Sequence, residues 1–442
     1  MRITNSMMRN NILMGLNKNK SQLSRLEQQM ATGKKIQKPS EDPIVAVRAI
    51  KLRTNLREID QYRSNINDAL SWMGVTEQAL TNITDVMKRI RDLSVQASSD
   101  TLGTGEREKI VSELEQLKSQ IQQEGNVNYA GRFVFTGYKT DTSLIFNNEN
   151  TETYQIKEEF SSEDIEEMTY IQDGTPPAQM EAYRVRLAYD NLQDADPPIN
   201  SIPTNGGADL NINTINSTDV DSYQPLAGEV NFLQDTGELI FNENDVNNVN
   251  PDFSFTYDKS GFNKNDLNPV HYFETVHKVD PLDNTTWVNY ANTNDKIEYQ
   301  VSYNQDIEVN SLGKNVITND LVRDIDELIK ETKNIPNDES DKQTLLEDEL
   351  GKKFEAMISK ADKHIKNIVG ATADLGSRMN RLELTDNRLE NDDLNFTDLM
   401  SQNEDVDISE VVVDMKSYET VYNASLMSSA SIMKPSLLDF IR

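Results

Sequence analysis

Mostly apolar residues at both ends of the chain recur at spacings of four and three, the period of a coiled-coil stripe on one face of an α-helix. The N-terminal stripe consists of Ile12, Leu16, Asn19, Leu23, Leu26 and Met30. The C-terminal stripe consists of Ile408, Val412, Met415, Tyr422, Leu426 and Met433. A single helix cannot bury such a stripe, because helices gain most of their stability from packing. The sequence therefore predicts that the first and last segments pair.

A polar connector separates the first stripe from the next helix. It is the segment ATGKKIQKPSEDP, residues 31–43, with three lysines and two prolines. Gly33 is suited to end the first helix, and both prolines restrict the backbone. The Ser-Glu-Asp triplet before Pro43 is typical of a helix N-terminus, with Pro43 at an early helical position.

Long helices are predicted on both sides of the chain's middle. The apolar period continues over residues 44–99 and returns over 340–397, where His364 falls on the stripe and is expected to pack there. Shorter helices are predicted around 110–121 and 321–328. These two halves form a discontinuous helical rod.

The middle of the chain has a different composition. Residues 146–295 are rich in Asn, Asp, Thr and Pro and contain Trp287, one of the two tryptophans. The segment EVNFLQDTGELIF, residues 229–241, is typical of a β-hairpin, and so is IEYQVSYNQDIEVN, residues 297–310. The predicted fold class is mainly α with a β-rich insertion.

Three domains are expected from these patterns, two of them discontinuous. The terminal coiled-coil domain is 1–42 with 398–442, and the long-helix rod domain with small β-hairpins is 43–145 with 296–397. The central β domain is 146–295.

Charge and composition exclude several classes of function. The chain has no cysteine, which excludes disulfides, zinc–thiolate sites and thiol nucleophiles. The net charge of −30 makes most of the surface repel nucleic acid and anionic membranes. Residues 1–63 nevertheless carry a net charge of +8 and residues 386–442 a net charge of −8, so that the two ends have opposite signs.

No catalytic, metal or cofactor site is expected. His271 and His277, in HYFETVH, lie too far apart on a strand and point to different faces of a helix, and no HExxH motif is present. Loops such as FNENDVNNVNPD and DKSGFNKND offer oxygen ligands for calcium without the order of an EF-hand loop. They are expected to be solvated, and the protein is not expected to be an enzyme.

Several stretches resemble the flagellin-like axial proteins of the bacterial flagellum. They are MRIT at 1–4, QMATGKKIQKPSEDP at 29–43, TEQALTNITDVMKRIRDLSVQASSD at 76–100, GRFVFTGYKTDTSLIF at 131–146, ADLGSRMNRLE at 373–383, NEDVDISEVVVDMKSYETVYNASL at 403–426 and SLLDFIR at 436–442. Within that superfamily the sequence is most similar to the hook-associated protein 3 family. The resemblance covers about residues 1–145 and 296–442.

The resemblance implies a structural role. The terminal helices would line the inner tube of the axial structure, and residues 31–43 would be a spoke between two shells. The expected residues of the terminal coiled coil and subunit interface are Ile12, Leu16, Leu23, Leu26, Met30, Ile408, Met415, Tyr422, Leu426, Met433, Leu437, Leu438 and Phe440. The expected spoke contacts are Lys34, Lys35 and Lys38. Met7, Met8, Leu13, Val411 and Leu438 are expected to remain as apolar surface that other molecules cover.

The implied function is the distal ring of the hook–filament junction, which joins the hook to the flagellin filament. The implied partners are the hook-side junction protein, flagellin, further copies in a ring, and an export chaperone on the C-terminal helix, about 404–442. The implied location is the extracellular flagellum, reached by type III export, with no contact to nucleic acid or membrane.

The alternative is a flagellin or minor filament subunit with a surface-exposed, adhesive central domain. An adhesin that binds a glycan through that domain and an enzyme housed in it are the alternatives from other classes.

Overall fold

The computed structural model describes residues 5–98, 104–172, 177–192, 202–205, 207–219, 221–281, 283–291, 296–335 and 341–432. The chain divides into two compact units. Unit 1 comprises Met1–Ile66, Val301–Asn304 and Glu383–Arg442, and unit 2 comprises Asn67–Gln300 and Gln305–Leu382. The three-domain division suggested by the sequence stays a prediction.

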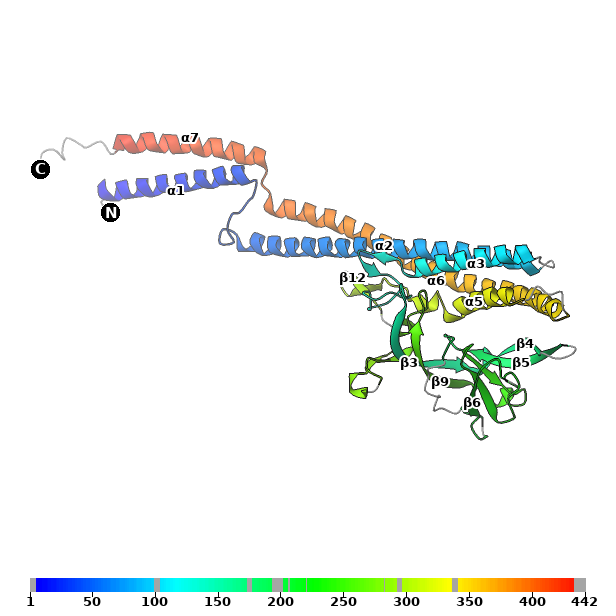
Figure 1. Cartoon of the computed structure of the whole chain (residues 1–442). Coiled ribbons are helices and arrows are strands. Elements are labelled where there is room, and N and C mark those ends of the chain that lie inside the picture. The colour runs from blue at the N-terminus through cyan, green and yellow to red at the C-terminus, as the bar shows by residue number, and fades with distance from the viewer. Residues whose placement is uncertain are drawn as a thin grey trace, which may run out of the picture. The chain divides into compact units, whose positions relative to one another are not determined.

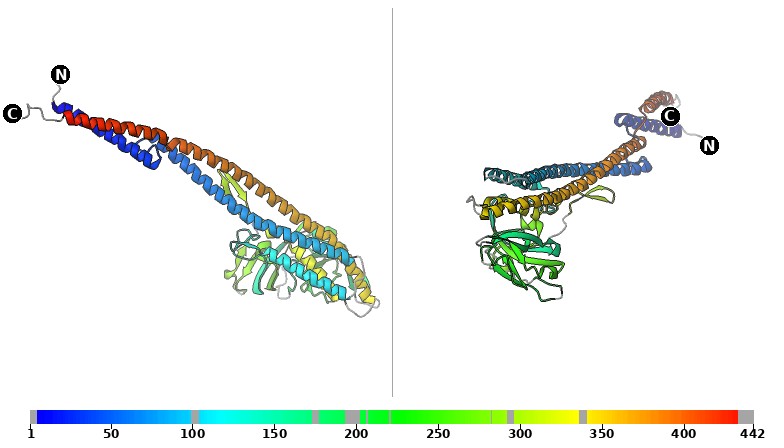
Figure 2. Two further views of the ribbon diagram at one scale, coloured as in Figure 1. Left: turned by 90° about the horizontal axis from the view of Figure 1, so that it is seen from above. Right: turned by 90° about the vertical axis from the view of Figure 1, so that its right-hand side faces the viewer.

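Unit 1 is built from the two ends of the chain. Helix α1 (Asn5–Thr32) lies beside helix α7 (Ile408–Ile432), as Figures 1 and 2 show in blue and red. Helix α1 ends where Gly33 adopts a φ of 69°, and the N–H of Gly33 donates to the carbonyl oxygen of Gln29 at 2.8 Å. The predicted pairing of the chain's ends is therefore present.

The next helix starts as its sequence predicts. Helix α2 (Pro43–Ser98) has Pro43 at its first position, and Oδ1 of Asp42 accepts hydrogen bonds from the N–H groups of Ile44 and Val45 at 3.0 and 3.1 Å. Helix α6 (Asp341–Glu404) is the second long helix, and both contribute residues to each unit. Within unit 1, Arg63 Nε on α2 lies 3.0 Å from Asp386 Oδ1 on α6.

Helices of unit 2 bury the predicted apolar stripes. Helices α3 (Thr104–Gly125) and α5 (Asn319–Asn334) pack together beside the long helices. The buried side chains of α2 in this unit include Met73, Leu80, Ile83, Met87 and Ile90, and those of α6 include Phe354, Met357, Ala361, His364, Ile368 and Leu375. No described helix is long and apolar enough to cross a membrane.

The central region forms two larger sheets. One has the strand order β11 (Val288–Tyr290), β10 (Glu274–Lys278), β3 (Asn150–Ser161) and β9 (Asp252–Phe262), all antiparallel. The other has the order β4 (Glu166–Gln172), β5 (Ala178–Arg186), β8 (Glu238–Phe241), β7 (Glu229–Leu233) and β6 (Asn211–Ile215). Its β6–β7 pair is parallel and its other pairs are antiparallel.

Smaller elements complete the described chain. Strands β1 (Asn128–Tyr129) and β2 (Arg132–Phe133) pair, as do β12 (Glu298–Ser302) and β13 (Gln305–Glu308). Helix α4 (Pro269–Tyr272) is short, and the 3-10 turns are η1 (Ser162–Asp164), η2 (Val246–Asn248), η3 (Asn284–Thr286) and η4 (Gly313–Asn315).

Both hairpins predicted from the sequence are confirmed as strand pairs. In β7–β8, Leu233 is opposite Glu238, and Gly237 in the turn has a φ of 66°. Long helices at both ends of the chain flank a β-rich middle, so the predicted fold class is confirmed.

Candidate functional site

The terminal helix pair is the candidate assembly site. On α1, Ile12, Leu16 and Leu23 are half-buried and Leu26 is buried. Asn19, the polar member of this stripe, donates from Nδ2 to Oγ of Ser425 on α7 at 3.3 Å. A polar pair inside a coiled-coil stripe fixes the register of the two helices.

The stripe of α7 is rotated from its predicted position. The buried or half-buried side chains include Val411, Met415, Tyr418, Tyr422, Ser425 and Ser429, which keep the four–three spacing. Met415 and Tyr422 were predicted, whereas Ile408 is 59% exposed and Leu426 is 41% exposed. The prediction that Val411 is free surface is wrong, since Val411 is 6% exposed. An apolar pattern missed this stripe because two of its members are serines.

The buried residue at the end of α1 also differs from the predicted one. Met30, the predicted last member of the stripe, is exposed, and Gln29 is buried in its place. The physical reason is a hydrogen bond, because Nε2 of Gln29 donates to the carbonyl oxygen of Lys35 at 2.6 Å. The predicted residues Met433, Leu437, Leu438 and Phe440 lie outside the described residues.

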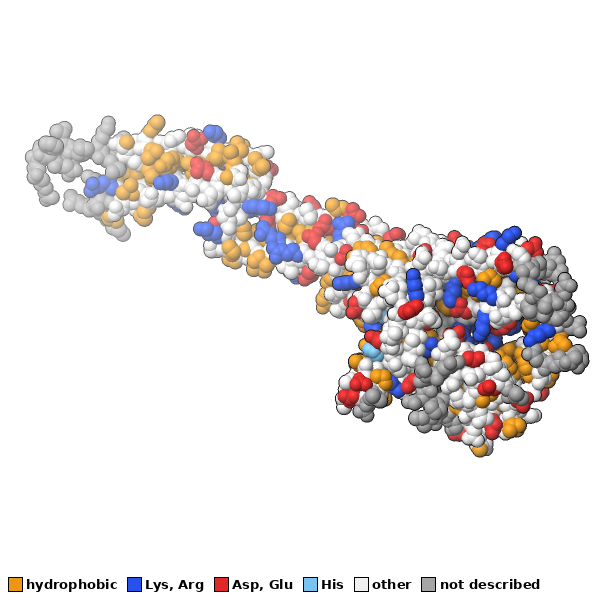
Figure 3. All heavy atoms as spheres, in the orientation of Figure 1, with side chains coloured by type: hydrophobic (Ala, Val, Ile, Leu, Met, Phe, Trp, Pro, Cys, Tyr) orange, Lys and Arg blue, Asp and Glu red, His pale blue; other side chains and the backbone are white. Residues whose placement is uncertain are grey.

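Large apolar side chains remain on the outer faces of both terminal helices, and Figure 3 shows them as orange patches. The exposed ones are Met7, Met8, Leu13, Met14 and Met30 on α1, and Ile408, Val412, Val413, Val421, Leu426 and Met427 on α7. Exposed apolar surface of this extent is typical of a face that another molecule covers.

The connector between α1 and α2 is clamped to the end of α6. Lys34 forms an antiparallel bridge with Asp405, and its Nζ lies 2.6 Å from Asp405 Oδ1. Glu404, which is 3% exposed, receives Arg53 Nη2 at 2.5 Å and Lys34 Nζ at 3.3 Å. The spoke is therefore held by ion pairs and backbone hydrogen bonds within unit 1.

The three predicted spoke lysines have different environments. Lys34 is engaged as above, and its hydrogen bond with Asp405 raises the pKa of the ammonium group. Lys35 donates from Nζ to the carbonyl oxygen of Gln402 at 2.6 Å. Lys38 is exposed, and its carbonyl oxygen accepts a hydrogen bond from the N–H of Glu41, but no described residue pairs with its ammonium group. Of the three, Lys38 is thus the one available to a neighbouring molecule.

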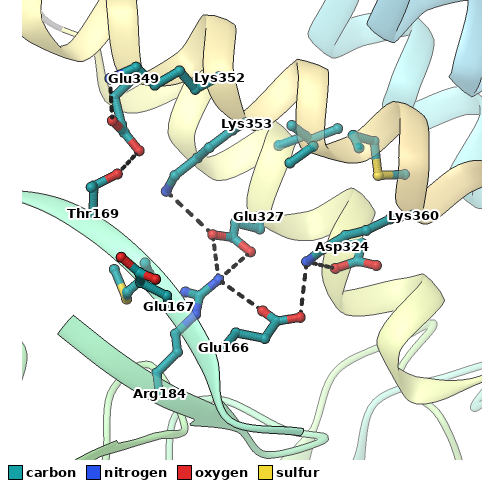
Figure 4. A pocket seen from close by; sticks show the side chains of 14 residues that line it. Glu166, Glu167, Thr169, Arg184, Asp324, Glu327, Glu349, Lys352, Lys353 and Lys360 are labelled. Carbon is teal, nitrogen blue, oxygen red and sulfur yellow. Dashed lines mark hydrogen bonds and ion pairs between the residues drawn. The ribbon is translucent and has the colours of Figure 1, made fainter. Parts of the chain in front are cut away.

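A second candidate is a charged cavity of about 460 Å³ in unit 2, shown in Figure 4. Arg184 on β5 lies 2.8 Å from Glu327 on α5 and 2.6 Å from Glu238 on β8. Lys353 on α6 lies 3.3 Å from Glu327. Lys360, also on α6, lies 2.9 Å from Asp324 on α5.

These charges neutralise one another. Burial favours the neutral form of Asp324, but hydrogen bonding to His364 and the charges of Arg186 and Lys360 hold the pKa of the carboxyl group well below its usual range. Burial likewise opposes ionisation of Glu327, and Arg184, Lys353 and Arg186 together keep its pKa low. These ion pairs join the five-stranded sheet to α5 and α6, and we interpret the cluster as an internal contact that holds the sheet against the two helices.

The predicted seam histidine belongs to this cluster. His364 is buried on α6, and its Nε2 lies 3.0 Å from Asp324 Oδ2. The sequence placed His364 on the stripe but carried no sign of its acidic partner 40 residues earlier.

The other two histidines occupy separate elements. His271 is on α4, where Nε2 lies 3.1 Å from Oγ1 of Thr142. His277 is on β10, where it stacks on Tyr154 and lies 3.4 Å from Glu152. In the parts of the chain that the structure describes, no group of three or more His, Cys, Asp or Glu side chains is arranged to hold a metal ion.

Two family models match the helical ends of the chain. Residues 3–140 match the bacterial flagellin N-terminal helical region, and residues 358–441 match the bacterial flagellin C-terminal helical region. Together these segments make up half of the chain.

Individual proteins match shorter stretches of the chain than the two family models do. A flagellar hook-associated protein 3 from Salmonella typhimurium is 28% identical over 144 residues, which cover 32% of this chain and 45% of that protein. A flagellin from Clostridium tyrobutyricum is 30% identical over 124 residues, which cover 28% of this chain and 33% of that protein. The chain thus spans less than half the length of these relatives.

Among solved structures, the flagellar junction protein FlgL from Legionella pneumophila aligns with 82% of this chain and 100% of its own. The TM-score is 0.34 at 12% identity, a similarity too low to support an argument.

Proposed function

Since the chain belongs to the flagellin-like family, with the N-terminal and C-terminal helical regions of bacterial flagellin at its two ends, we propose that it is a structural subunit of the hook–filament junction. The observation that supports this role is the apolar outer surface of the paired helices α1 and α7. The match to a hook-associated protein 3 favours the junction over other positions in the flagellum.

In this role the terminal helix pair is the part that polymerises. Its outer faces contact neighbouring subunits, which are the hook-side junction protein, flagellin and further copies of this chain in a ring. The expected contact residues that are exposed on it are Met30, Ile408 and Leu426, together with Lys38 on the spoke. The ion pairs of Lys34 and Arg53 with Glu404 attach the spoke to the end of α6 within unit 1.

The proposed role also implies where the subunit acts and how its chain divides into functional parts. The subunit acts in the extracellular flagellum, after export with a chaperone bound to its C-terminal segment. Its three functional parts are 1–42 with 398–442 for the inner tube, 43–145 with 296–397 for the rod, and 146–295 as an outer domain. It performs no catalysis and uses no cofactor, nucleic acid or membrane.

The alternative is a flagellin or minor filament subunit with an adhesive central domain. The observation that favours it is the match to a flagellin at 30% identity, since the helical regions are common to both kinds of protein. A deletion of the gene in its host distinguishes the two. Hooks without filaments, with flagellin released into the medium, are expected for a junction protein, whereas intact filaments would contradict the proposal.

Complementation of the deletion strain tests the assembly surface itself. The variant Val413→Asp, Met427→Asp places charges on two exposed apolar positions of α7, and we expect it to fail to restore filaments. The control is Leu226→Asp, at a position in unit 2 that is also exposed, which should restore them. Restoration by both variants would show that the outer face of α7 is not an assembly surface.

A further inference from the structure

An apolar patch lies on the first turns of α2, outside the terminal helix pair. Ile44, Val47 and Ile50 are 67%, 66% and 60% exposed. Ala46 and Ala49 occupy the opposite side of the same turns and are buried. The patch therefore points away from the interior of unit 1, and we call these three residues the α2 patch.

Positive charge lies beside the α2 patch. Arg48 and Lys51 are exposed beside it, and the described residues offer neither of them an ion-pair or hydrogen-bond partner. Residues 43–66 contain five Lys or Arg against two Asp or Glu. Figure 3 shows blue side chains gathered over this part of α2. Cations without acidic partners, next to apolar side chains, favour a surface that is itself apolar and acidic.

The last turns of α6, also in unit 1, present such a surface. Leu394 is 63% exposed, and Glu390 and Asp398, one helical turn before and after it, are exposed on the same face. Asp398 accepts a hydrogen bond from the amide of Gln402, and no described cation pairs with it. Residues 383–404 contain seven Asp or Glu against one Lys or Arg. We call Glu390, Leu394 and Asp398 the α6 patch.

We propose that a second copy of this chain covers the α2 patch with its α6 patch. The two surfaces match in polarity and have opposite charge, whereas two α2 patches would repel each other through Arg48 and Lys51. A contact between two different patches of one molecule is heterologous, so it repeats from copy to copy around a ring or along a helix. The inference rests on the proposed function and specifies which surfaces join neighbouring copies.

Disulfide trapping tests the contact directly, because the native chain has no cysteine. The variants Val47→Cys and Leu394→Cys are purified separately, concentrated and mixed under mild oxidation. A covalent dimer is expected in the mixture, at least ten times more abundant than with either variant alone. Dimers from Val47→Cys alone, or no excess in the mixture over Val47→Cys with the exposed control Leu226→Cys, would overturn the inference.

Charge reversal in the deletion strain gives a second measurement. Lys51→Glu and Asp398→Lys are each expected to reduce the number of filaments, and the double variant in one chain should restore it, because each copy then meets a reversed neighbour. Double variants no better than the single ones would contradict the pairing. Intact filaments in the deletion strain itself would instead refute the junction role, and disulfide trapping would still decide the contact.

Discussion

Glu158 on β3 is a carboxylic acid inside the β region of unit 2. It is fully enclosed, and its Oε1 accepts hydrogen bonds from the hydroxyl of Tyr257 and from the N–H of Ala188, the latter at 2.9 Å. Burial raises the pKa of Glu158 to about 7, although both hydrogen bonds and the charge of Arg323 favour the ionised form. The group is therefore partly protonated at neutral pH.

This raised pKa predicts a specific pH dependence of stability. The folded state holds the proton of Glu158 up to about pH 7, while the unfolded chain releases it near pH 4.5, so the free energy of unfolding falls as the pH rises between these values. The contribution lost is about 3 kcal/mol, since one pKa unit corresponds to about 1.4 kcal/mol. The variant Glu158→Gln keeps a neutral acceptor and should not show this loss.

Urea unfolding at pH 5, 6, 7 and 8 measures the difference between the two proteins. Both tryptophans, Trp72 and Trp287, lie in unit 2, so their fluorescence follows the unit that contains Glu158. Other buried carboxyl groups with raised pKa, such as Asp266 and Asp320, remain in both proteins and cancel in the comparison. Parallel pH profiles for the two proteins would show that Glu158 does not titrate in this range.

At the scale of one element, the β7–β8 hairpin depends on the glycine in its turn. Gly237 has a φ of 66°, and its carbonyl oxygen accepts a hydrogen bond from the N–H of Leu187 at 2.9 Å. A Cβ atom at this position would lie 1.9 Å from the carbonyl oxygen of Tyr189. Gly228 also has a positive φ, of 84°, but nothing lies within 4 Å of its Cβ position.

Alanine variants of these two glycines distinguish the cost of backbone strain from the cost of a steric clash. Gly228→Ala is expected to cost about 1 kcal/mol, the price of a left-handed conformation for an ordinary residue. Gly237→Ala adds a backbone clash and is expected to cost about 3 kcal/mol or more. Urea unfolding followed by tryptophan fluorescence compares both variants with the native chain. Equal losses would mean that the backbone around Tyr189 moves aside without penalty.

At the scale of the whole molecule, the two units differ in how completely they are enclosed. In α1, Leu26 and Gln29 are the described residues that are fully buried, whereas the part of α2 in unit 2 buries Ala69, Met73 and Leu80. The described turns of α1 and α7 thus have few buried apolar contacts, and such segments open at low cost in free energy.

We therefore expect unequal hydrogen exchange in the dilute, purified protein. The amides of α1 and α7 should exchange at least a hundredfold faster than those of α2 between residues 69 and 90. Assembly should slow exchange in α1 and α7, because neighbouring molecules then cover their outer faces. Hydrogen exchange with mass spectrometry measures both conditions, and equally slow exchange in all these helices of the dilute protein would contradict the expectation.

Apolar periodicity predicted the elements well where a stripe is continuous and buried on one side. Leu350, Phe354, Met357, Ala361 and His364 all face the interior as the spacing indicates. The same approach failed on α7, because Ile408 and Leu426 fit the pattern as well as Val411 does. The polar pair of Asn19 with Ser425 selects the stripe, and a partner 406 residues away is invisible in either segment.

The sequence by itself determined the helices, their ends at Gly33 and Asp42, the hairpin at Gly237 and the pairing of the chain's two ends, because these depend on local conformation and on period. Only the tertiary structure decided which face of α7 meets α1, that Lys34 and Arg53 converge on Glu404, and that Arg184 on β5 meets Glu327 on α5. Such contacts join segments distant in the chain, and their energy depends on distances and burial that exist only after folding.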